Sequence, residues 1–86
     1  MVTEILKRDG RTSKYEKRKI TEAIYKAAEA VGGQDYQIAR ELSDQVDKIL
    51  NERYVDIIPT VEQIQDIVEK TLIESGHAKT AKNYIL

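Results

Sequence analysis

Apolar side chains recur at intervals of three and four residues along most of this 86-residue sequence. That spacing lines them up on one face of an α-helix, and such a helix is stable only when another element covers that face. The first helix is predicted from near Lys17 to Gly32-Gly33, because glycine adopts the left-handed backbone that ends a helix at no steric cost. Its apolar face is formed by Ile20, Ala23, Ile24, Ala27, Ala28 and Val31.

A second helix is predicted from about Asp35, which can cap its N-terminus, to Asn51. Its apolar face is formed by Ala39, Leu42, Val46, Ile49 and Leu50.

The third helix has the clearest start in the chain. The run Thr-Val-Glu-Gln at positions 60–63 matches the capping box, in which the threonine hydroxyl accepts from the glutamine amide and the glutamine side chain reaches back. Gly76 ends this helix, and a last helix is predicted from His77 to the end of the chain. The third helix is predicted to bury Val61, Ile64, Ile67 or Val68, Thr71 and Leu72, and the last to bury Ala78, Ala81, Tyr84 and Ile85.

The remaining segments favour strands. Positions 2–7 and 11–15 flank Asp9-Gly10, a pair typical of a two-residue type I′ hairpin turn. A competing interpretation takes Ser13 to Glu16 as a capping box that starts the first helix earlier. The β-branched run from Tyr54 to Ile58, closed by Pro59, is predicted to be a third strand that joins the hairpin.

These elements predict the order β-β-α-α-β-α-α. We expect a mainly helical α+β fold, a four-helix bundle capped by a small three-stranded sheet, because this arrangement covers all the apolar faces together. A chain of 86 residues allows one small domain, residues 1–86.

Catalytic side chains are scarce. The chain has no cysteine, which excludes disulfides and thiolate chemistry, and no phosphate-loop or nucleophile-elbow motif. His77 follows a helix-ending glycine, a context that favours a capping or surface role over a general base. No metal-ligand cluster at helical spacing is present, and no apolar run approaches the length of a membrane span. We therefore expect a cytoplasmic, soluble protein that is not an enzyme and binds no membrane.

Charge is unevenly distributed along the chain. Residues 1–19, which we call the basic head, hold seven basic and three acidic residues and carry +4, whereas the remainder carries −5. This pattern indicates either an anionic ligand or simply a solvated charged hairpin. If the hairpin folds over the start of the first helix, Lys7, Arg8 and Lys19 converge on one anion.

Four segments in order resemble the ATP-cone family. They are positions 6–11 (Leu-Lys-Arg-Asp-Gly-Arg), 15–20 (Tyr-Glu-Lys-Arg-Lys-Ile), 59–69 (Pro-Thr-Val-Glu-Gln-Ile-Gln-Asp-Ile-Val-Glu), and the ending from Gly76-His77 through Thr-Ala-Lys to Tyr-Ile-Leu. The resemblance covers essentially the whole chain. It implies the bundle and sheet described above and a regulatory domain usually found at the N-terminus of ribonucleotide reductases.

The resemblance also implies a ligand and partners. ATP-cones bind ATP or dATP, with or without Mg²⁺, and set overall reductase activity by allostery and altered oligomerisation. The expected partners are the adenine nucleotide and the catalytic domain of the parent reductase, with self-association as a further option. The Gly-His-x-x-Thr-Ala-Lys ending resembles the anaerobic class, whose parent would be a ribonucleoside-triphosphate reductase.

Five candidate site residues carried over from the family lie on the hairpin and the first helix and bind phosphate or flank the base. Lys7 and Arg8 correspond to the phosphate-binding pair, and Lys19 to a further phosphate or ribose contact. Ile5 and Ile20 would flank the adenine, which suits an apolar face on each side of a flat base.

The other four candidates are polar. Glu16 could accept from a base amine or a ribose hydroxyl, and Ser13 stands where the family often has glutamate. Thr60 and Gln65 lie where the third helix begins and meets the nucleotide. The family continues past Leu86 into a basic stretch that contacts phosphate.

Two other functions stay open. One is the ATP-cone of a nucleotide-sensing transcriptional repressor, and the other is a protein-interaction module without a ligand. The acidic body, and the lack of cysteine for the zinc-binding segment that such repressors use on DNA, argue against nucleic acid as a partner.

Overall fold

The computed structural model describes residues 1–85. Four helices follow a short hairpin, in the order β-β-α-α-α-α, so the helical prediction is confirmed and the sheet has two strands in place of three. The elements are β1 (Glu4–Leu6), β2 (Thr12–Lys14), α1 (Lys17–Ala30), α2 (Tyr36–Arg53), α3 (Val61–Glu74) and α4 (Ala78–Ile85).

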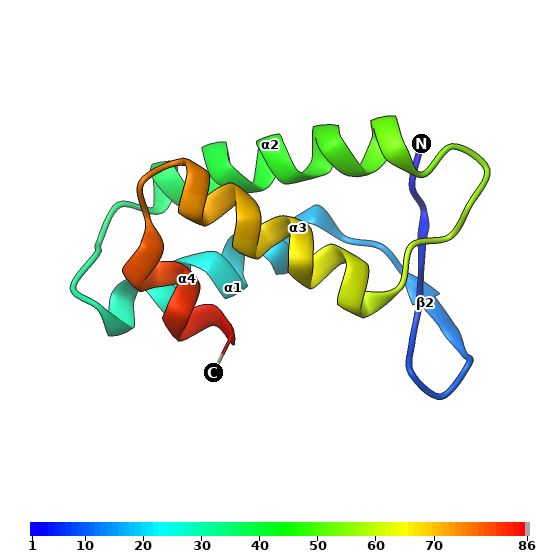
Figure 1. The fold of residues 1–86 in the computed structure, drawn as a ribbon, viewed down its shortest axis with the longest axis horizontal. Coiled ribbons are helices and arrows are strands. Elements are labelled where there is room, and N and C mark those ends of the chain that lie inside the picture. Colours follow the sequence, from blue (N-terminus) through cyan, green and yellow to red (C-terminus); the bar gives the residue numbers. More distant parts are fainter. Residues whose placement is uncertain (86) are drawn as a thin grey trace.

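The helices pack around one core, and the hairpin stands at one end of them (Figure 1). Helix α1 contacts α2 and α4, and α3 contacts α2 and α4, so each long helix covers the apolar face of another. The largest fully buried side chains of the core are Ile24, Val46, Leu50, Val68 and Leu72. These lie on the predicted faces of α1, α2 and α3, which explains why the periodicity located the core.

The helix starts follow the predicted caps. Helix α1 begins at Lys17, and α2 begins after Asp35, whose carboxylate accepts from the backbone amide of Gln37 at 2.9 Å. At the start of α3 the amide of Gln63 donates to the hydroxyl of Thr60 at 3.0 Å, and the Gln63 side chain accepts from the Thr60 amide at 2.9 Å. The capping box is therefore complete.

The hairpin turn differs from the prediction. Ile5 lies opposite Ser13, and Leu6 opposite Thr12, which leaves a three-residue loop at positions 8–10. Gly10 has a φ of +86°, whereas the φ of Asp9 is negative, so the loop is not a type I′ turn but a turn followed by a left-handed glycine. The Asp9 carboxylate accepts from the backbone amide of Arg11 at 3.0 Å and thereby holds this longer loop.

The predicted third strand at positions 54–58 is wrong. Tyr54 ends α2, and Asp56 has a left-handed φ of +62°, which breaks the extended backbone that a strand needs. The segment reaches the hairpin only at its far end, where the Leu6 amide donates to the Pro59 carbonyl at 2.9 Å and Leu6 forms a single bridge to Thr60. Val55 is 62% exposed, so this apolar run lies at the surface.

Some predicted apolar faces are also corrected at their ends. Val31, Ala78 and Ile85 are exposed, because each lies at the end of a helix where no neighbouring element covers it. Conversely, Thr21 and Ser43 are buried in the interface of α1 and α2, where their hydroxyls hydrogen-bond to each other. That mutual bond satisfies two polar groups that would otherwise be costly to bury.

Candidate functional site

The hairpin loop sets the position of two basic side chains. The Lys7 amide donates to the Arg11 carbonyl at 2.8 Å, and the Lys7 carbonyl accepts from the Gly10 amide at 3.0 Å. Lys7 is therefore the last paired residue of the first strand segment, and Arg8 is the first residue of the loop. Both side chains lie at the surface, where an anion can reach them.

Arg8 links the hairpin tip to the start of α3. Its Nε donates to Oε2 of Glu62 at 2.6 Å, although the side chains are 76% and 47% exposed. The hydrogen bond from Arg8 holds the pKa of the Glu62 carboxyl below its usual value. An exposed pair of this kind is weak, so Glu62 orients Arg8 without preventing an exchange for a more highly charged anion.

The start of α1 concentrates positive charge. Its first turn contains no acidic residue and begins with Lys17, Arg18 and Lys19, beside the positive end of the helix dipole. Glu16 occupies the N-cap position but makes no side-chain cap; its Oε2 instead lies 3.3 Å from Nζ of Lys19. Lys17 and Arg18 are likewise paired with acidic side chains, Asp44 at 2.6 Å and Glu22 at 3.8 Å. These pairs are largely exposed and therefore weak, so a more highly charged anion can displace them.

The two apolar candidates are largely committed to the core. Ile5 is half-buried and packs against the core, and Ser13 lies opposite it on the same face of the hairpin. Ile20 is 9% exposed and belongs to the core itself. Both side chains therefore take part in core packing, and Ile5 leaves more of its surface exposed than Ile20 does.

The two candidates at α3 differ. The Thr60 hydroxyl is used in the helix cap, and its backbone lies beside the hairpin through the bridge to Leu6. Gln65 is exposed and lies three residues after Glu62, so the two share one side of α3. Gln65 is thus a turn further along the surface that begins at the pair of Arg8 and Glu62.

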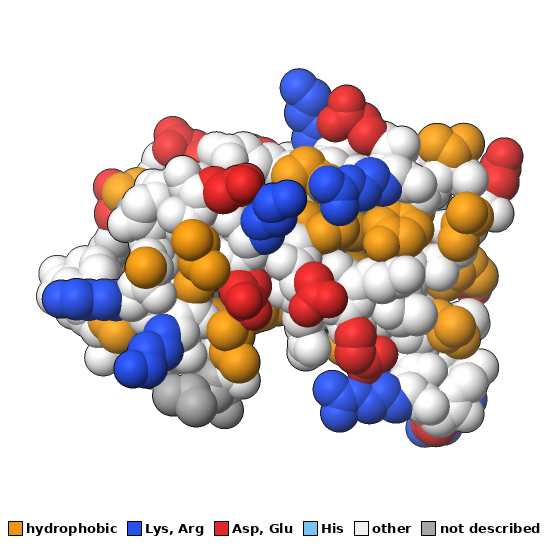
Figure 2. All heavy atoms as spheres, in the orientation of Figure 1, with side chains coloured by type: hydrophobic (Ala, Val, Ile, Leu, Met, Phe, Trp, Pro, Cys, Tyr) orange, Lys and Arg blue, Asp and Glu red, His pale blue; other side chains and the backbone are white. Residues whose placement is uncertain are grey.

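The nine candidates therefore fall into three neighbouring groups. The hairpin carries Ile5, Lys7, Arg8 and Ser13; the start of α1 carries Glu16, Lys19 and Ile20; and the first turns of α3 carry Thr60 and Gln65. A hydrogen bond from Arg8 to Glu62 joins the hairpin to α3, and an ion pair joins Glu16 to Lys19. In the space-filling view the surface is hollowed between the hairpin end of the molecule and the end that carries α4 (Figure 2).

Sequence reasoning missed Glu62 as a member of this region. In the sequence Glu62 is an interior position of the capping box, and its contact with Arg8 spans 54 positions along the chain. An acidic residue in the first turn of a helix is explained by the helix dipole alone. No local signal pointed to the arginine.

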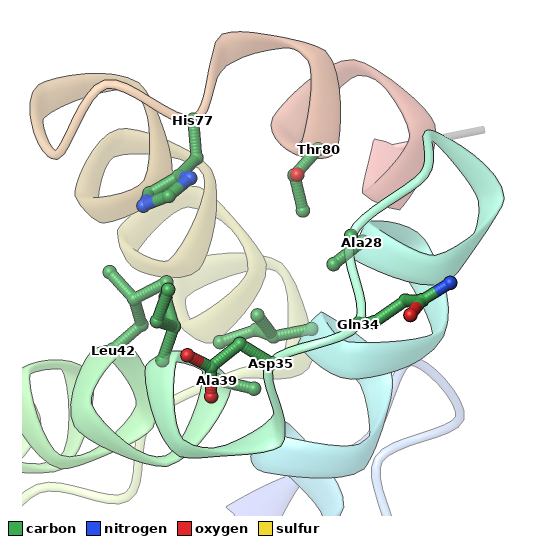
Figure 3. Close-up of a pocket in the computed structure, with 10 residues that line it drawn as sticks. Ala28, Gln34, Asp35, Ala39, Leu42, His77 and Thr80 are labelled. Carbon is green, nitrogen blue, oxygen red and sulfur yellow. The ribbon is translucent and has the colours of Figure 1, made fainter.

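A cavity lies away from the candidate site residues. It has a volume of about 110 Å³ and is lined by residues from the end of α1, the start of α2 and the start of α4. His77 and Thr80 lie on one side of it, opposite Asp35, Ala39 and Leu42 (Figure 3). None of the candidate residues line it. The His77 carbonyl accepts from the Ala81 amide at 2.9 Å at the start of α4.

Two kinds of feature are absent from residues 1–85. In this part of the chain no group of three or more His, Cys, Asp or Glu side chains is arranged to hold a metal ion. Of the helices described, none combines the length and the apolar character needed to cross a membrane.

The comparison with known families places the chain. Residues 3–86 match the family described as "ATP cone domain". The protein therefore belongs to the ATP-cone family, and the resemblance drawn from its four segments is confirmed at that level.

Its relatives are ribonucleotide reductases. The chain is 43% identical, over its whole length, to the vitamin B12-dependent ribonucleoside-diphosphate reductase of Thermoplasma acidophilum, of which it covers 12%. It is 36% identical over 99% of its length to the ribonucleoside-diphosphate reductase subunit alpha of Chlamydia pneumoniae, covering 9% of that protein. It is 35% identical over 94% of its length to the anaerobic ribonucleoside-triphosphate reductase of Haemophilus influenzae, covering 11%.

The chain thus spans about a tenth of the length of the relatives it matches. The expected link to the anaerobic class in particular is not supported by these relatives. The B12-dependent enzyme shares more identity with the chain than the anaerobic enzyme does.

Proposed function

We propose that the protein is a regulatory domain that binds ATP or dATP at the basic head and sets the activity of a ribonucleotide reductase. The observation that carries the proposal is the exposed cation cluster at the hairpin tip and at the start of α1, in a chain whose remainder is acidic. Membership of the ATP-cone family supports the adenine nucleotide as the ligand.

The triphosphate is the part of the ligand that the cluster suits best. Arg8 offers a planar fork to phosphate oxygens, and Lys7 and Lys19 supply mobile point charges. For this, Arg8 exchanges its exposed partner Glu62 for phosphate, and Lys19 turns from Glu16.

The adenine base and the ribose of the ligand lie against the apolar and polar residues that surround the cation cluster. Ile5 and Ile20 offer an apolar edge for the adenine, and Glu16, released from Lys19, accepts from a base amine or a ribose hydroxyl. Ser13, Thr60 and Gln65 complete the polar rim on the hairpin and α3.

A regulatory role requires that the domain distinguish its two ligands. ATP and dATP differ only in the ribose 2′-hydroxyl, and leaving a partner of that hydroxyl unpaired costs about 1–3 kcal/mol. Allosteric coupling energies are also about 1–3 kcal/mol. One such hydrogen bond is therefore large enough to bias the assembly of a parent reductase, or of this chain with itself.

Isothermal titration calorimetry of the chain with ATP, dATP and GTP tests the proposal, with a DNA duplex as a fourth titrant. We expect micromolar binding of both adenine nucleotides, weak binding of GTP and no binding of DNA. Salt-sensitive binding of the duplex without nucleotide binding would identify a nucleic-acid domain. Absence of heat with all four titrants would leave a protein-interaction module and contradict the proposal.

A further inference from the structure

We propose that three side chains outside the family-derived site, Tyr15, Asp47 and Asn51, form a latch that sets the position of the basic head and transmits nucleotide binding to α2. The inference rests on the function proposed above and adds its route of regulation. None of the nine candidate site residues lies on α2. The helix can therefore sense the nucleotide through the groups that connect it to the head, which are the latch and the exposed ion pair between Nζ of Lys17 and Oδ1 of Asp44, 2.6 Å apart.

The latch consists of three hydrogen bonds. The Tyr15 hydroxyl donates to Oδ1 of Asp47 at 2.7 Å, and the backbone amide of Val2 donates to Oδ1 of Asn51 at 2.6 Å. The Asn51 side-chain amide donates to the Asp47 carbonyl at 2.8 Å, which fixes the orientation of the oxygen that receives Val2. Asp47 and Asn51 are four residues apart, so both point from the same face of α2.

The partly buried environment of the latch strengthens its hydrogen bonds. Val2 is buried, and Tyr15, Asp47 and Asn51 are half-buried, so the bonds are partly removed from water. Hydrogen bonds to a charged acceptor are stronger than neutral ones and strengthen further in such surroundings. Burial, together with the bond to Asp47, raises the pKa of the Tyr15 phenol above its ordinary value of 10.0, so the hydroxyl remains a donor well into the alkaline range.

The latch holds both strands of the hairpin. The Tyr15 amide donates to the Thr3 carbonyl at 2.9 Å, so the bond at Tyr15 and the bond at Val2 fasten the two strands to α2 together. Tyr15 also directly precedes Glu16 at the N-cap of α1. A shift of the hairpin toward a bound triphosphate therefore strains the same hydrogen bonds that α2 provides.

The first experiment measures ATP affinity by calorimetry in four variants. Tyr15→Phe keeps the ring and removes the donor, and Asp47→Ala removes the acceptor; we expect each to weaken ATP binding by about fivefold. Asp47→Asn retains an acceptor oxygen and should bind within about twofold of the wild type. Tyr25→Phe is the matched control, because it removes a phenol hydroxyl from a tyrosine that packs against the same core but takes part in no latch bond.

Two further measurements separate positioning from general stability. The double variant Tyr15→Phe/Asp47→Ala should lose no more affinity than either single variant, because both remove the same interaction. Amide hydrogen exchange followed by NMR should show that ATP slows exchange at Val2 and along the second half of α2 in the wild type. In Tyr15→Phe the effect on α2 should be lost while the hairpin is still protected.

The outcomes distinguish this inference from the function on which it rests. If the wild type binds ATP and the folded Tyr15→Phe and Asp47→Ala variants bind equally well, the latch does not position the site. If ATP protects only the hairpin in the wild type, transmission to α2 is wrong. If the wild type binds neither ATP nor dATP, the proposed function fails first and the latch has nothing to transmit.

Discussion

At the hairpin tip, Lys7 and Arg8 are neighbours with different surroundings. Arg8 is paired with Glu62, whereas Lys7 makes no ion pair with any residue of the described chain. Neither side chain contributes to the core, so both can be changed with little effect on folding.

The double substitution Lys7→Ala/Arg8→Ala is expected to weaken ATP binding by roughly tenfold or more, because charge-assisted hydrogen bonds to phosphate are lost. The melting temperature should stay within about 4 °C of the wild type, as for other exposed positions. Calorimetry and thermal denaturation measure the two quantities. Lys48→Ala/Lys70→Ala removes the same charge from exposed positions on α2 and α3 and should leave affinity unchanged; an equal loss there would point to a nonspecific charge effect.

Glu62 competes with phosphate for Arg8. The substitution Glu62→Gln removes the negative charge and retains the shape, so ATP affinity is expected to rise a few-fold, in keeping with the small strength of exposed pairs. Titration of ATP into this variant checks the prediction. Weaker binding would instead show that Glu62 is needed to hold Arg8 toward the ligand.

Tyr15 gives the protein a defined response to alkali. Its phenol pKa is raised in the folded state, first by burial and then by the hydrogen bond to Asp47, above the ordinary value of 10.0. Its contribution to the free energy of unfolding is complete below pH 10 and declines as the pH rises from there, because the unfolded chain loses the proton first. The difference in unfolding free energy between the wild type and Tyr15→Phe, measured in urea from pH 7 to 11, should therefore shrink above about pH 10. A constant difference would mean that the phenol is not shifted.

Among the elements, the helix starts were the most predictable. Asp35 and the capping box at Thr60 are signals carried by three or four adjacent residues, and the structure confirms both. The turn type and the third strand were not predictable in this way. Asp9 is held by the side chain and amide of Arg11, and Asp56 adopts a left-handed backbone that the β-branched residues around it do not reveal.

The same distinction between local and long-range signals applies to the candidate site. The cation cluster proposed to bind phosphate could be found from the sequence, because charge clusters are visible without a fold. The pairing of Arg8 with Glu62 and of Tyr15 with Asp47 could not, since these contacts join residues 54 and 32 positions apart and depend on how the helices pack. Ile20 has a second use that the charge pattern does not reveal, because the side chain proposed to face the ligand also belongs to the core.

The contribution of the Thr60 N-cap of α3 to stability can be measured by substitution. Thr60→Ala removes the hydroxyl that accepts from the Gln63 amide and is expected to lower the free energy of unfolding by about 1 kcal/mol. Thr60→Ser keeps an acceptor in the same place and should recover most of that loss. Urea denaturation of the two variants without nucleotide measures the effect, and equal stability of Thr60→Ala and wild type would contradict it.

On the scale of the whole molecule, the hairpin and the helices form one unit held by contacts at the two sides of the hairpin. Helix α2 holds it through Tyr15 and Val2, and α3 holds it through Arg8 and the bridge at Leu6. A ligand that binds the head of the folded protein and not the unfolded chain must therefore stabilise the entire domain.

ATP at about 100 times its dissociation constant is expected to add about 2.7 kcal/mol to the free energy of unfolding. For a domain of this size that corresponds to a rise in melting temperature of roughly 10–20 °C. Differential scanning calorimetry with increasing ATP checks the shift, and GTP provides the comparison. A melting temperature that does not change with ATP would exclude a tight site in the folded state.

The hydrogen bond between Leu6 and Pro59 also occupies a backbone donor at the strand edge that another molecule could otherwise pair with. A free strand edge next to an apolar run is a common seed for fibres that grow from one molecule to the next. Here the Leu6 amide is already hydrogen-bonded to the Pro59 carbonyl, and proline has no backbone N–H to donate, so a ladder of strand hydrogen bonds is interrupted between this point and the run that holds Val55, Ile57 and Ile58. The exposed apolar residues of this loop can therefore remain in contact with water without a second molecule adding a β-strand to them.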